Sequence, residues 1–470
     1  MHLHRLQLRK SPLSPLLVLA ALAFLAPRTA HAEARLLVEA DSGKVLEAEN
    51  ATIPWYPASV TKMMTAYVTL KAVKDGKITL DTLFTVSPVA ASQSPSKMGF
   101  KPGTQVTVDN ALKMMLVKSA NDMAVVLAEG VGGSIDGFSA MMNQTAQKLG
   151  MTQTSYVNPN GLPADGQITS ARDLAILARA IIHDLPEYEY FVHIPSIRYG
   201  RRVTQNFNKL IGRYPGADGF KTGFICASGY NLVASATRDG KRLIAVVLGA
   251  SSGTMRAVRA AQLLDRGFSG NGLAWIKPSL GTVDQLVPVD ASPPNLRDDM
   301  CSGKRHRPAS DEDEDSVASN ASSPSSNGGE SSTPFSVAGL QAPLQKPSEL
   351  LAGSPAPSEP IPVYTGPTRT GAALIAAVAA DADEQARQAH HGKHAHGRKL
   401  AARDTAKDGA AAAKPAGNHA SAKGDASPKS AAVGDTPAGR PAKPKAAAKT
   451  ADKPASKPPK SSSGEGKPAG

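Results

Sequence analysis

Two hairpin patterns at opposite ends of one globular stretch constrain the fold of this sequence more than any other feature. Residues 34–50 predict two strands around a turn at 41–43. Residues 230–250 predict two more strands, rich in Val, Ile and Leu, around a turn at 239–240. Helical patterns fill most of the sequence between them. We therefore expect an α/β fold in which distant hairpins share one sheet around a helical insertion, rather than repeated strand-helix-strand units.

The helical patterns carry their own start and stop signals. Apolar side chains between residues 60 and 71 follow helical spacing. Thr107 and Ser134 precede two further amphipathic stretches as N-cap candidates, and Gly150 ends the second stretch. Residues 170–185 predict another amphipathic helix, so the globular part is expected to be rich in helices outside the two hairpins.

Both ends of the chain differ from the globular part. Residues 1–32 have a basic start, an apolar run at 16–25 and an Ala-His-Ala end, which predicts a cleaved secretory signal peptide. An uncleaved anchor is the alternative, although the apolar run is short for a membrane span. We expect an exported protein of the periplasm or cell envelope without a transmembrane anchor. The globular domain should span 33–275, with a linker at 276–301 that packs near it.

Residues 302–470 are rich in Ala, Pro, Ser, Lys and Gly, and they contain few aromatic residues. Such a composition buries too little apolar surface to offset the entropy of ordering, so we expect a disordered tail. The formal net charge of +13 owes much to this end. Its lysines between Lys443 and Lys460 form an extended polycation, for which anionic envelope polymers are the expected partner and a solvated spacer is the alternative. Export excludes nucleic acid as a partner.

The two cysteines, Cys226 and Cys301, are compatible with a disulfide in an oxidising compartment. However, Cys301 lies where the globular pattern fades, so we expect no bridge. Cys226 is then expected to be a small buried residue, with a reactive thiol as the alternative. No Cys/His spacing indicates a structural zinc site, and nothing suggests a metal at a catalytic site.

Ser59 and Lys62 stand one helical turn apart in the segment PASVTKMM, which is otherwise largely apolar. A serine hydroxyl becomes a nucleophile when a base takes its proton. Lysine can be that base if burial and a second cation lower its pKa from about 10.4 to about 8. Alone, this spacing is weak evidence, because Ser-x-x-Lys also occurs in helices whose lysine lies at the surface.

Two further motifs strengthen the prediction. Ser119 and Asn121 lie in a Ser-Ala-Asn break between two helical patterns, and residues 221–223 read Lys-Thr-Gly just before a strand. The combination of Ser-x-x-Lys, a second serine element and Lys-Thr-Gly is the signature of serine β-lactamases and penicillin-binding proteins. A glycine at 223 would let a substrate backbone approach the strand closely.

These motifs lie in YPASVTKMMTAYV, VKSANDMAVVLAE and KTGF. Together with LGMTQTSYVNPNGLP, TSARDLAILARAII and residues 229–250, they resemble the D-alanyl-D-alanine carboxypeptidases, the low-molecular-weight penicillin-binding proteins of serine peptidase family S11. The resemblance covers residues 34–268. It implies a β-lactamase/transpeptidase-like fold, in which helices flank an antiparallel sheet beside an all-helical subdomain, followed here by the disordered tail. Residues 33–275 would be the catalytic domain, without a cofactor or a metal.

The resemblance also implies a role for each motif residue. Ser59 would be the nucleophile, Lys62 its general base and Ser119 a proton relay. The substrate would be bound by Asn121, Lys221, Thr222, Gly223, Phe224 and Arg256. Within this set, Lys221 would also keep Lys62 neutral, Phe224 would share an oxyanion hole with the Ser59 N–H, and Arg256 would hold the substrate carboxylate. Arg172 and Asp173 are expected to be structural.

The expected reaction removes the terminal D-alanine from peptidoglycan pentapeptides through an acyl-enzyme, and β-lactams would acylate the same serine. An endopeptidase that cuts D-alanyl cross-links has the same motifs and stays open as an alternative. A β-lactamase is disfavoured because no Glu-x-x-Leu-Asn element lies between Asn121 and Lys221. A binding protein whose tail carries the function is disfavoured by the intact motifs.

Overall fold

The computed structural model describes residues 33–269, 278–302, 346–383, 385 and 387, all within the first of two compact units of the chain. The second unit, residues 400–470, lies outside the described residues, as do the predicted signal peptide at 1–32 and residues 303–345. No helix in the described part is both long and apolar enough to cross a bilayer.

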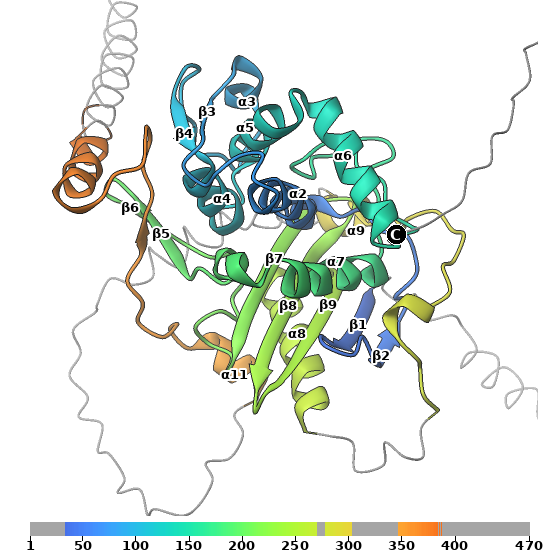
Figure 1. Cartoon of the computed structure of the whole chain (residues 1–470). Helices are drawn as coiled ribbons and strands as arrows, with labels where there is room; N and C mark the ends of the chain where they lie inside the picture. The colour runs from blue at the N-terminus through green and yellow to red at the C-terminus, as the bar shows by residue number, and fades with distance from the viewer. Residues whose placement is uncertain (1–32, 270–277, 303–345, 384, 386, 388–470) are drawn as a thin grey trace, which may run out of the picture. The chain divides into compact units, whose positions relative to one another are not determined.

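The two hairpins at the ends of the globular stretch share one sheet, as predicted (Figure 1). Five antiparallel strands run in the order β2-β1-β9-β8-β7. Strand β1 lies inside the sheet between β2 and β9, with Ala34 opposite Leu248. The strands are β1 (Ala34–Glu39), β2 (Val45–Glu49), β7 (Ala217–Ile225), β8 (Gly229–Arg238) and β9 (Lys241–Ala250).

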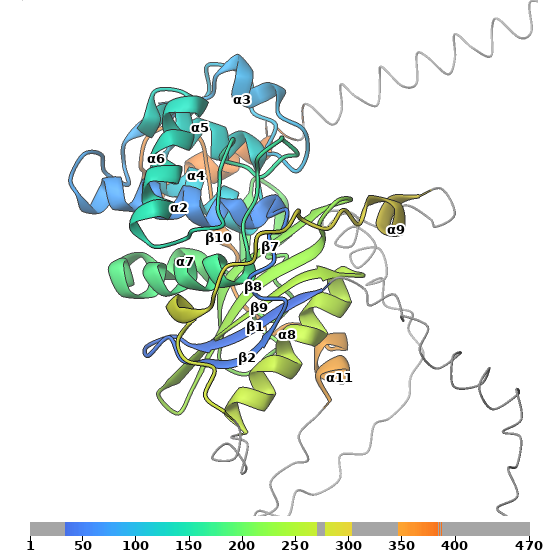
Figure 2. The ribbon, with the colours of Figure 1, turned by 90° about the vertical axis from the view of Figure 1, so that its right-hand side faces the viewer.

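Each face of the sheet carries helices, because β9 alternates its buried side chains between two cores. Ile244 and Val246 enter the core that contains α7 (Ala171–Asp184), whereas Ala245 and Val247 enter the core that contains α8 (Gly253–Phe268). Figure 2 shows α7 and α8 on opposite sides of the sheet. Both faces are therefore buried, which explains why β8 and β9 read as nearly continuous apolar runs.

The sequence between the hairpins forms the predicted helical part. Thr107 and Ser134 cap α4 and α6 by accepting hydrogen bonds from Asn110 N at 3.2 Å and Gly137 N at 2.9 Å. The elements of this part are η1 (Ala58–Thr61), α2 (Lys62–Lys74), β3 (Leu83–Thr85), α3 (Pro88–Ser92), β4 (Gln105–Thr107), α4 (Val108–Val117), α5 (Asn121–Gly132) and α6 (Ile135–Lys148). The remaining elements are η2 (Pro186–Val192), β5 (Ser196–Tyr199), β6 (Arg202–Gln205), η3 (Val283–Gln285), α9 (Arg297–Cys301), α11 (Pro347–Ala352) and β10 (Ile361–Pro362).

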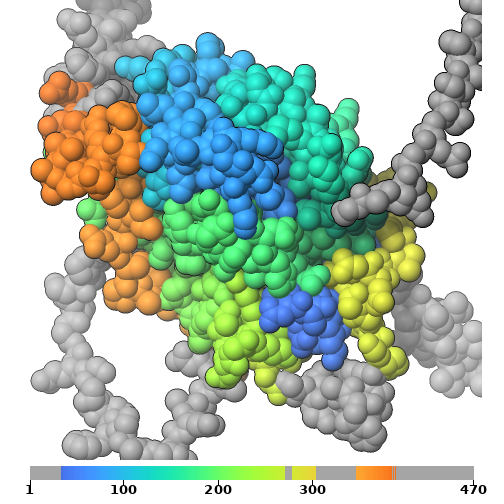
Figure 3. All heavy atoms as spheres, in the orientation of Figure 1, coloured from blue at the N-terminus to red at the C-terminus, as the bar shows by residue number. Residues whose placement is uncertain are grey.

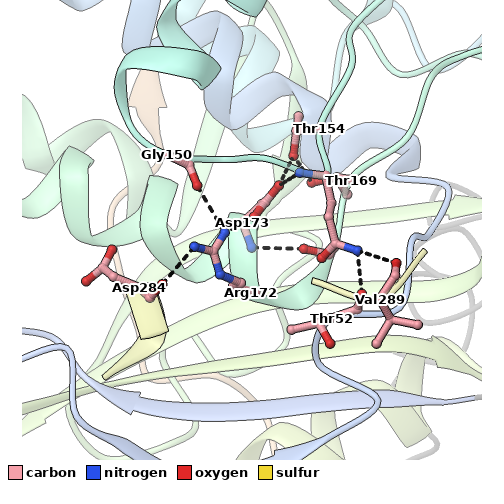
Figure 4. A network of polar contacts seen from close by, with 10 residues as sticks. Thr52, Gly150, Thr154, Thr169, Arg172, Asp173, Asp284 and Val289 are labelled. Carbon is pink, nitrogen blue, oxygen red and sulfur yellow. Dashed lines mark hydrogen bonds and ion pairs between the residues drawn. The ribbon is translucent and has the colours of Figure 1, made fainter. Parts of the chain in front are cut away.

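Residues 278–302 run back across the domain. Their backbone bonds to β2, where Val45 N donates to Gly281 O at 2.9 Å. Figure 4 shows the polar network beneath this segment, in which buried Arg172 pairs with Asp173 at 2.8 Å and donates to the Asp284 carbonyl at 3.1 Å. Burial raises the pKa of Asp173, while Arg172 and a hydrogen bond from Thr154 act in the opposite direction. The network is structural, as expected for Arg172 and Asp173.

The expectation of an unpaired Cys226 is wrong, because Cys226 and Cys301 form a disulfide with their Cα atoms 5.7 Å apart. The reason is the return of residues 278–302, which sequence periodicity does not reveal. Leu296 N donates to Ala227 O at 3.0 Å, and this bond places α9 beside the end of β7. A reactive thiol at Cys226 is excluded in this oxidised state.

The structure also departs from the prediction of a tail without order from residue 302 onward. Residues 346–383 are described, with α11, β10 and a helix at 371–383. Strand β10 pairs in parallel with β5, and Val363, next to β10, is fully buried. A few apolar residues at 361–364 are enough to bind a sheet edge, although the average composition of residues 302–470 predicts no core. Residues 388–470 lie outside the described part, and their disorder stays a prediction.

The disulfide leads to a first prediction. Its cysteines are 75 residues apart in sequence, so replacing both with serine should lower the free energy of unfolding by about 2–4 kcal/mol. Urea titrations of the parent and the double variant would measure this difference. As a control, a reductant should destabilise the parent and leave the double variant unchanged. Equal stability of the two oxidised proteins would contradict the structural role given to the bridge.

Candidate active site

Ser59 lies in the short 3-10 helix η1, which continues into α2 at Lys62, so the two side chains share one face as predicted. The preceding residue, Ala58, has a φ of 50°, a left-handed conformation that is costly for a residue with a side chain. Gly161 packs directly against this turn, because a Cβ there would lie 1.8 Å from Ala58 O. The strained turn therefore depends on a glycine from a loop about 100 residues further along the chain.

The Lys62 amine is completely buried and has three polar neighbours. Its Nζ lies 2.9 Å from Ser59 Oγ, 2.7 Å from Asn121 Oδ1 and 2.6 Å from Asn160 O. Burial lowers the pKa of Lys62 well below its usual value, and the nearby Lys221 cation lowers it further, while Asp122 acts in the opposite direction. The structure therefore excludes a surface position for this lysine and favours its neutral form.

The second motif lies in the break between α4 and α5. Ser119 is almost fully buried and has a φ of 62°, so the left-handed region is occupied at this motif as well as at Ala58. Asn121 begins α5, and its side chain bridges two segments by accepting from Lys62 and donating to Ser94 O at 2.9 Å. The structure thus brings Asn121 into direct contact with the Ser59–Lys62 pair and places Ser119 two residues before it.

The third motif lies within β7, the edge strand of the sheet next to η1. A Cβ on Gly223 would come within 2.8 Å of Ser59 N, so glycine allows the strand to approach the backbone of the serine turn. Lys221 and Thr222 are both buried. Asn231 on β8 holds the turn from the sheet side by donating to Tyr56 O and Pro57 O at 3.0 and 3.1 Å.

Phe224 and Arg256 line the far side of this strand. The Phe224 ring packs against the Tyr230 ring with centroids 4.2 Å apart. Arg256 on α8 is buried, and its guanidinium donates to Gly223 O and Phe207 O, each at 3.4 Å. Arg256 therefore supports the backbone of the Lys-Thr-Gly strand, and its contact with a substrate carboxylate stays a prediction.

Two residues at the site were not assigned a role from the sequence. Asn160 supplies the carbonyl that binds Lys62, and the NPNGLP segment around it is turn-rich. Asp122 is fully buried and accepts from the backbone N–H groups of Met98 and Gly99 at 3.1 and 2.9 Å. Burial raises the pKa of Asp122, and these backbone hydrogen bonds oppose the shift. The sequence signal that could have identified Asp122 is its position directly after the motif residue Asn121.

The described residues include no group of three or more His, Cys, Asp or Glu side chains arranged to hold a metal ion. What the site does contain is a serine hydroxyl, a buried amine, an amide and a second buried lysine beside an edge strand. This arrangement defines a serine acyl-transfer enzyme of the β-lactamase and penicillin-binding protein class.

Comparison with known proteins identifies the family within this class. The D-alanyl-D-alanine carboxypeptidase model, peptidase S11, matches residues 22–252. The chain is 41% identical to the D-alanyl-D-alanine carboxypeptidase DacC of Escherichia coli over 286 residues, which cover 58% of this chain and 71% of DacC. This protein therefore belongs to the D-alanyl-D-alanine carboxypeptidases of family S11, and it is a serine peptidase.

Other relatives match about half of the chain. DacF of Bacillus subtilis is 38% identical, with 51% of this chain and 62% of DacF covered. DacA of E. coli is 39% identical, with 50% of this chain and 60% of DacA covered. The structure of penicillin-binding protein 5 from Haemophilus influenzae superposes with a TM-score of 0.50 at 37% identity and covers 52% of this chain and 73% of that protein. The chain thus spans less than two thirds of DacF and DacA.

The electrostatic coupling between the two lysines leads to a second prediction. Replacing Lys221 with Gln removes a cation that lowers the pKa of Lys62, so that pKa should rise. A smaller fraction of Lys62 is then neutral at pH 7, and acylation by a fluorescent penicillin should slow by about 10- to 100-fold. In a plot of the acylation rate of this variant against pH, the acidic limb should also move to higher pH.

The conservative Lys221→Arg variant is the matched control, because it keeps the positive charge while altering the shape of the side chain. Its acidic limb should remain close to that of the parent even if its maximal rate falls. If the acidic limb of Lys221→Gln stays at the position of the parent, Lys221 does not lower the pKa of Lys62.

Proposed function

We propose that this protein removes the terminal D-alanine from peptidoglycan pentapeptides through an acyl-enzyme on Ser59. The observation that carries the proposal is the set of three neighbours around Lys62 Nζ. Asn121 Oδ1 and Asn160 O can only accept hydrogen bonds, whereas the Ser59 hydroxyl can also donate one. A neutral amine has two N–H groups for the two carbonyls and one lone pair for the Ser59 proton, which suits a general base.

The proposed acylation follows from this arrangement. Lys62 Nζ takes the Ser59 proton as Oγ attacks the penultimate D-alanyl carbonyl, and the oxygen charge develops toward the backbone N–H groups of Ser59 and Phe224. The C–N bond then breaks, and the leaving D-alanine amine receives a proton through Lys62 and Ser119. The acyl ester on Ser59 is hydrolysed by a water that Lys62 deprotonates, which restores the free serine.

The remaining motif residues are proposed to position the substrate. Asn121 would bind its amide, and the cation of Lys221 and the hydroxyl of Thr222 would bind its terminal carboxylate. Gly223 would allow the peptide to lie along β7, and Arg256 would assist through the Gly223 carbonyl that it holds. β-Lactams would acylate Ser59 as inhibitors, because their strained amide mimics the D-alanyl-D-alanine end.

Location and attachment are also proposed from the sequence alone. Residues 1–32 would direct export, and the catalytic domain would act in the periplasm or cell envelope, where its peptide substrate lies. The lysine-rich residues 443–460 would bind anionic envelope polymers by counterion release.

Intact-protein mass spectrometry of residues 33–470 with benzylpenicillin tests the acyl-enzyme. The parent should gain a stable penicilloyl adduct, and Ser59→Ala should gain none, because the variant lacks the attacking oxygen. Release of D-alanine from a peptide that ends in D-Ala-D-Ala should fall by at least about 10³-fold in the same variant.

Ser92→Ala is the matched control, because Ser92 is exposed at the end of α3, and this variant should behave as the parent. An adduct on Ser59→Ala would refute the nucleophile. Rapid turnover of penicillin by the parent would indicate a β-lactamase instead.

A further inference from the structure

The segment 361–366 docks along the edge of the β5–β6 hairpin and reaches the helical part. Val363 N donates to Arg198 O at 2.9 Å, next to the parallel pairing of β10 with β5. Tyr364 N donates to Asn110 Oδ1 at 3.2 Å, and Gly366 N donates to Gln105 O at 2.7 Å. These bonds hold the segment against both α4 and β4, so it joins two parts of the catalytic domain. Figure 3 shows the described C-terminal residues in orange, part of them beside the blue surface of the helical part.

Further along the chain, Gln385 also contacts the hairpin. Gln385 Oε1 accepts from Arg201 N at 3.2 Å, and its Nε2 donates to Tyr199 O at 3.1 Å. The turn between β5 and β6 is therefore fixed from outside by a residue almost 200 positions later in the chain. The hairpin is also fixed from inside, because the rings of Tyr199 and Phe100 meet edge to face at 5.2 Å.

A cavity of about 260 Å³ lies between these elements. Its walls come from the loop before β4, the end of α4 at Lys118, the β5–β6 hairpin, and two residues near the C-terminal end of the described part, Thr365 and Gln385. The lining residues are Met98, Gly99, Phe100, Lys101, Thr104, Lys118, Ile197, Tyr199, Arg202, Thr204, Thr365 and Gln385. Without the C-terminal segment, Thr365 and Gln385 would be missing and the cavity would be open on that side.

All charged side chains in this lining are cations: Lys101, Lys118 and Arg202. Lys101 and Arg202 are exposed, and neither has an ion pair or a side-chain hydrogen bond within the described part of the chain. Lys118 is buried, and its Nζ donates to Ser96 Oγ at 3.3 Å. Three cations without an acidic residue in the same wall create a positive potential that favours an anion.

Lys118 in the wall of the cavity is linked to the second motif by sequence and by hydrogen bonds. Ser96 Oγ donates to the Lys118 carbonyl at 2.8 Å, and Ser96 O accepts from Asn121 N at 2.7 Å. Asn121 in turn contacts Lys62, and Lys118 directly precedes Ser119. One wall residue, Lys118, is therefore adjacent to the Ser-Ala-Asn motif, and the loop that contains Ser96 is hydrogen-bonded to both.

We propose that this cavity is a subsite for a free carboxylate on the part of the peptide substrate that precedes the scissile D-alanyl bond. The inference rests on the proposed function, since it names a second contact for the same substrate. Lys101 and Arg202 bind the carboxylate, and the Thr104, Thr204 and Thr365 hydroxyls are available as further donors. A volume of about 260 Å³ fits a side chain or a short peptide branch better than a whole ligand of drug size.

Two pentapeptides that end in D-Ala-D-Ala test the subsite, one with a free upstream carboxylate and one with that group amidated. The parent should show a kcat/KM about five- to tenfold higher for the carboxylate peptide, mainly through KM, because two charge pairs form in the complex. This preference should shrink as salt is raised, since exposed charges are screened. In Lys101→Gln/Arg202→Gln, the ratio of the two kcat/KM values should fall toward one.

Lys148→Gln is the matched control, because Lys148 is an exposed lysine at the end of α6, and the ratio should stay at the parent value. Labelling by a fluorescent penicillin confirms that the double variant is folded. Equal use of both peptides by the parent, or an unchanged preference in the double variant, would overturn the subsite alone. Failure of the parent to cleave either peptide would overturn the proposed function and the subsite with it.

Discussion

A lysine amine held in the dry interior is the constraint on which the site depends. Lys62 is fully buried, so its neighbours must supply its hydrogen bonds. The same neighbours also determine how far its pKa falls. Those neighbours come from the serine turn, the start of α5 and the loop at Asn160, and a second lysine on β7 adds repulsion. Sheet and helical part must therefore meet closely here, which accounts for the strained Ala58 and for the close glycines at 161 and 223.

Local signals in the sequence predicted much of the fold because they act over short distances. The turns at 41–43 and 239–240 and the caps at Thr107 and Ser134 are confirmed, since each depends on a few neighbouring residues. The Cys226–Cys301 bridge and the docking of residues 361–366 were not predicted. Both depend on where a segment returns in space, and a composition that looks disordered on average conceals a few residues that bind a specific edge.

In the candidate site too, some residues could be predicted from the sequence and others could not. Ser59, Lys62, Asn121 and Lys221 are recognisable because their residue types and spacing are demanded by the chemistry, and the structure brings them together. Asn160 contributes only a backbone carbonyl, which any residue type could supply, so no side-chain pattern marks it. The contact of the Arg256 guanidinium with the Gly223 carbonyl could not be predicted from the sequence, and the expected role of Arg256 at a substrate carboxylate stays a prediction.

The position of β1 has a consequence for the order in which this domain can fold. β1 (Ala34–Glu39) pairs with β9 (Lys241–Ala250), so an internal strand made early must wait for a partner made about 200 residues later. Until β9 emerges from the ribosome, β1 can pair with β2 alone, and a two-stranded hairpin is marginal in water. The five-stranded sheet can therefore close only after the chain has been made through residue 250. Asn231 on β8 and Gly223 on β7 also support the serine turn, so the turn and the strand that completes the site reach their final arrangement together, late in synthesis.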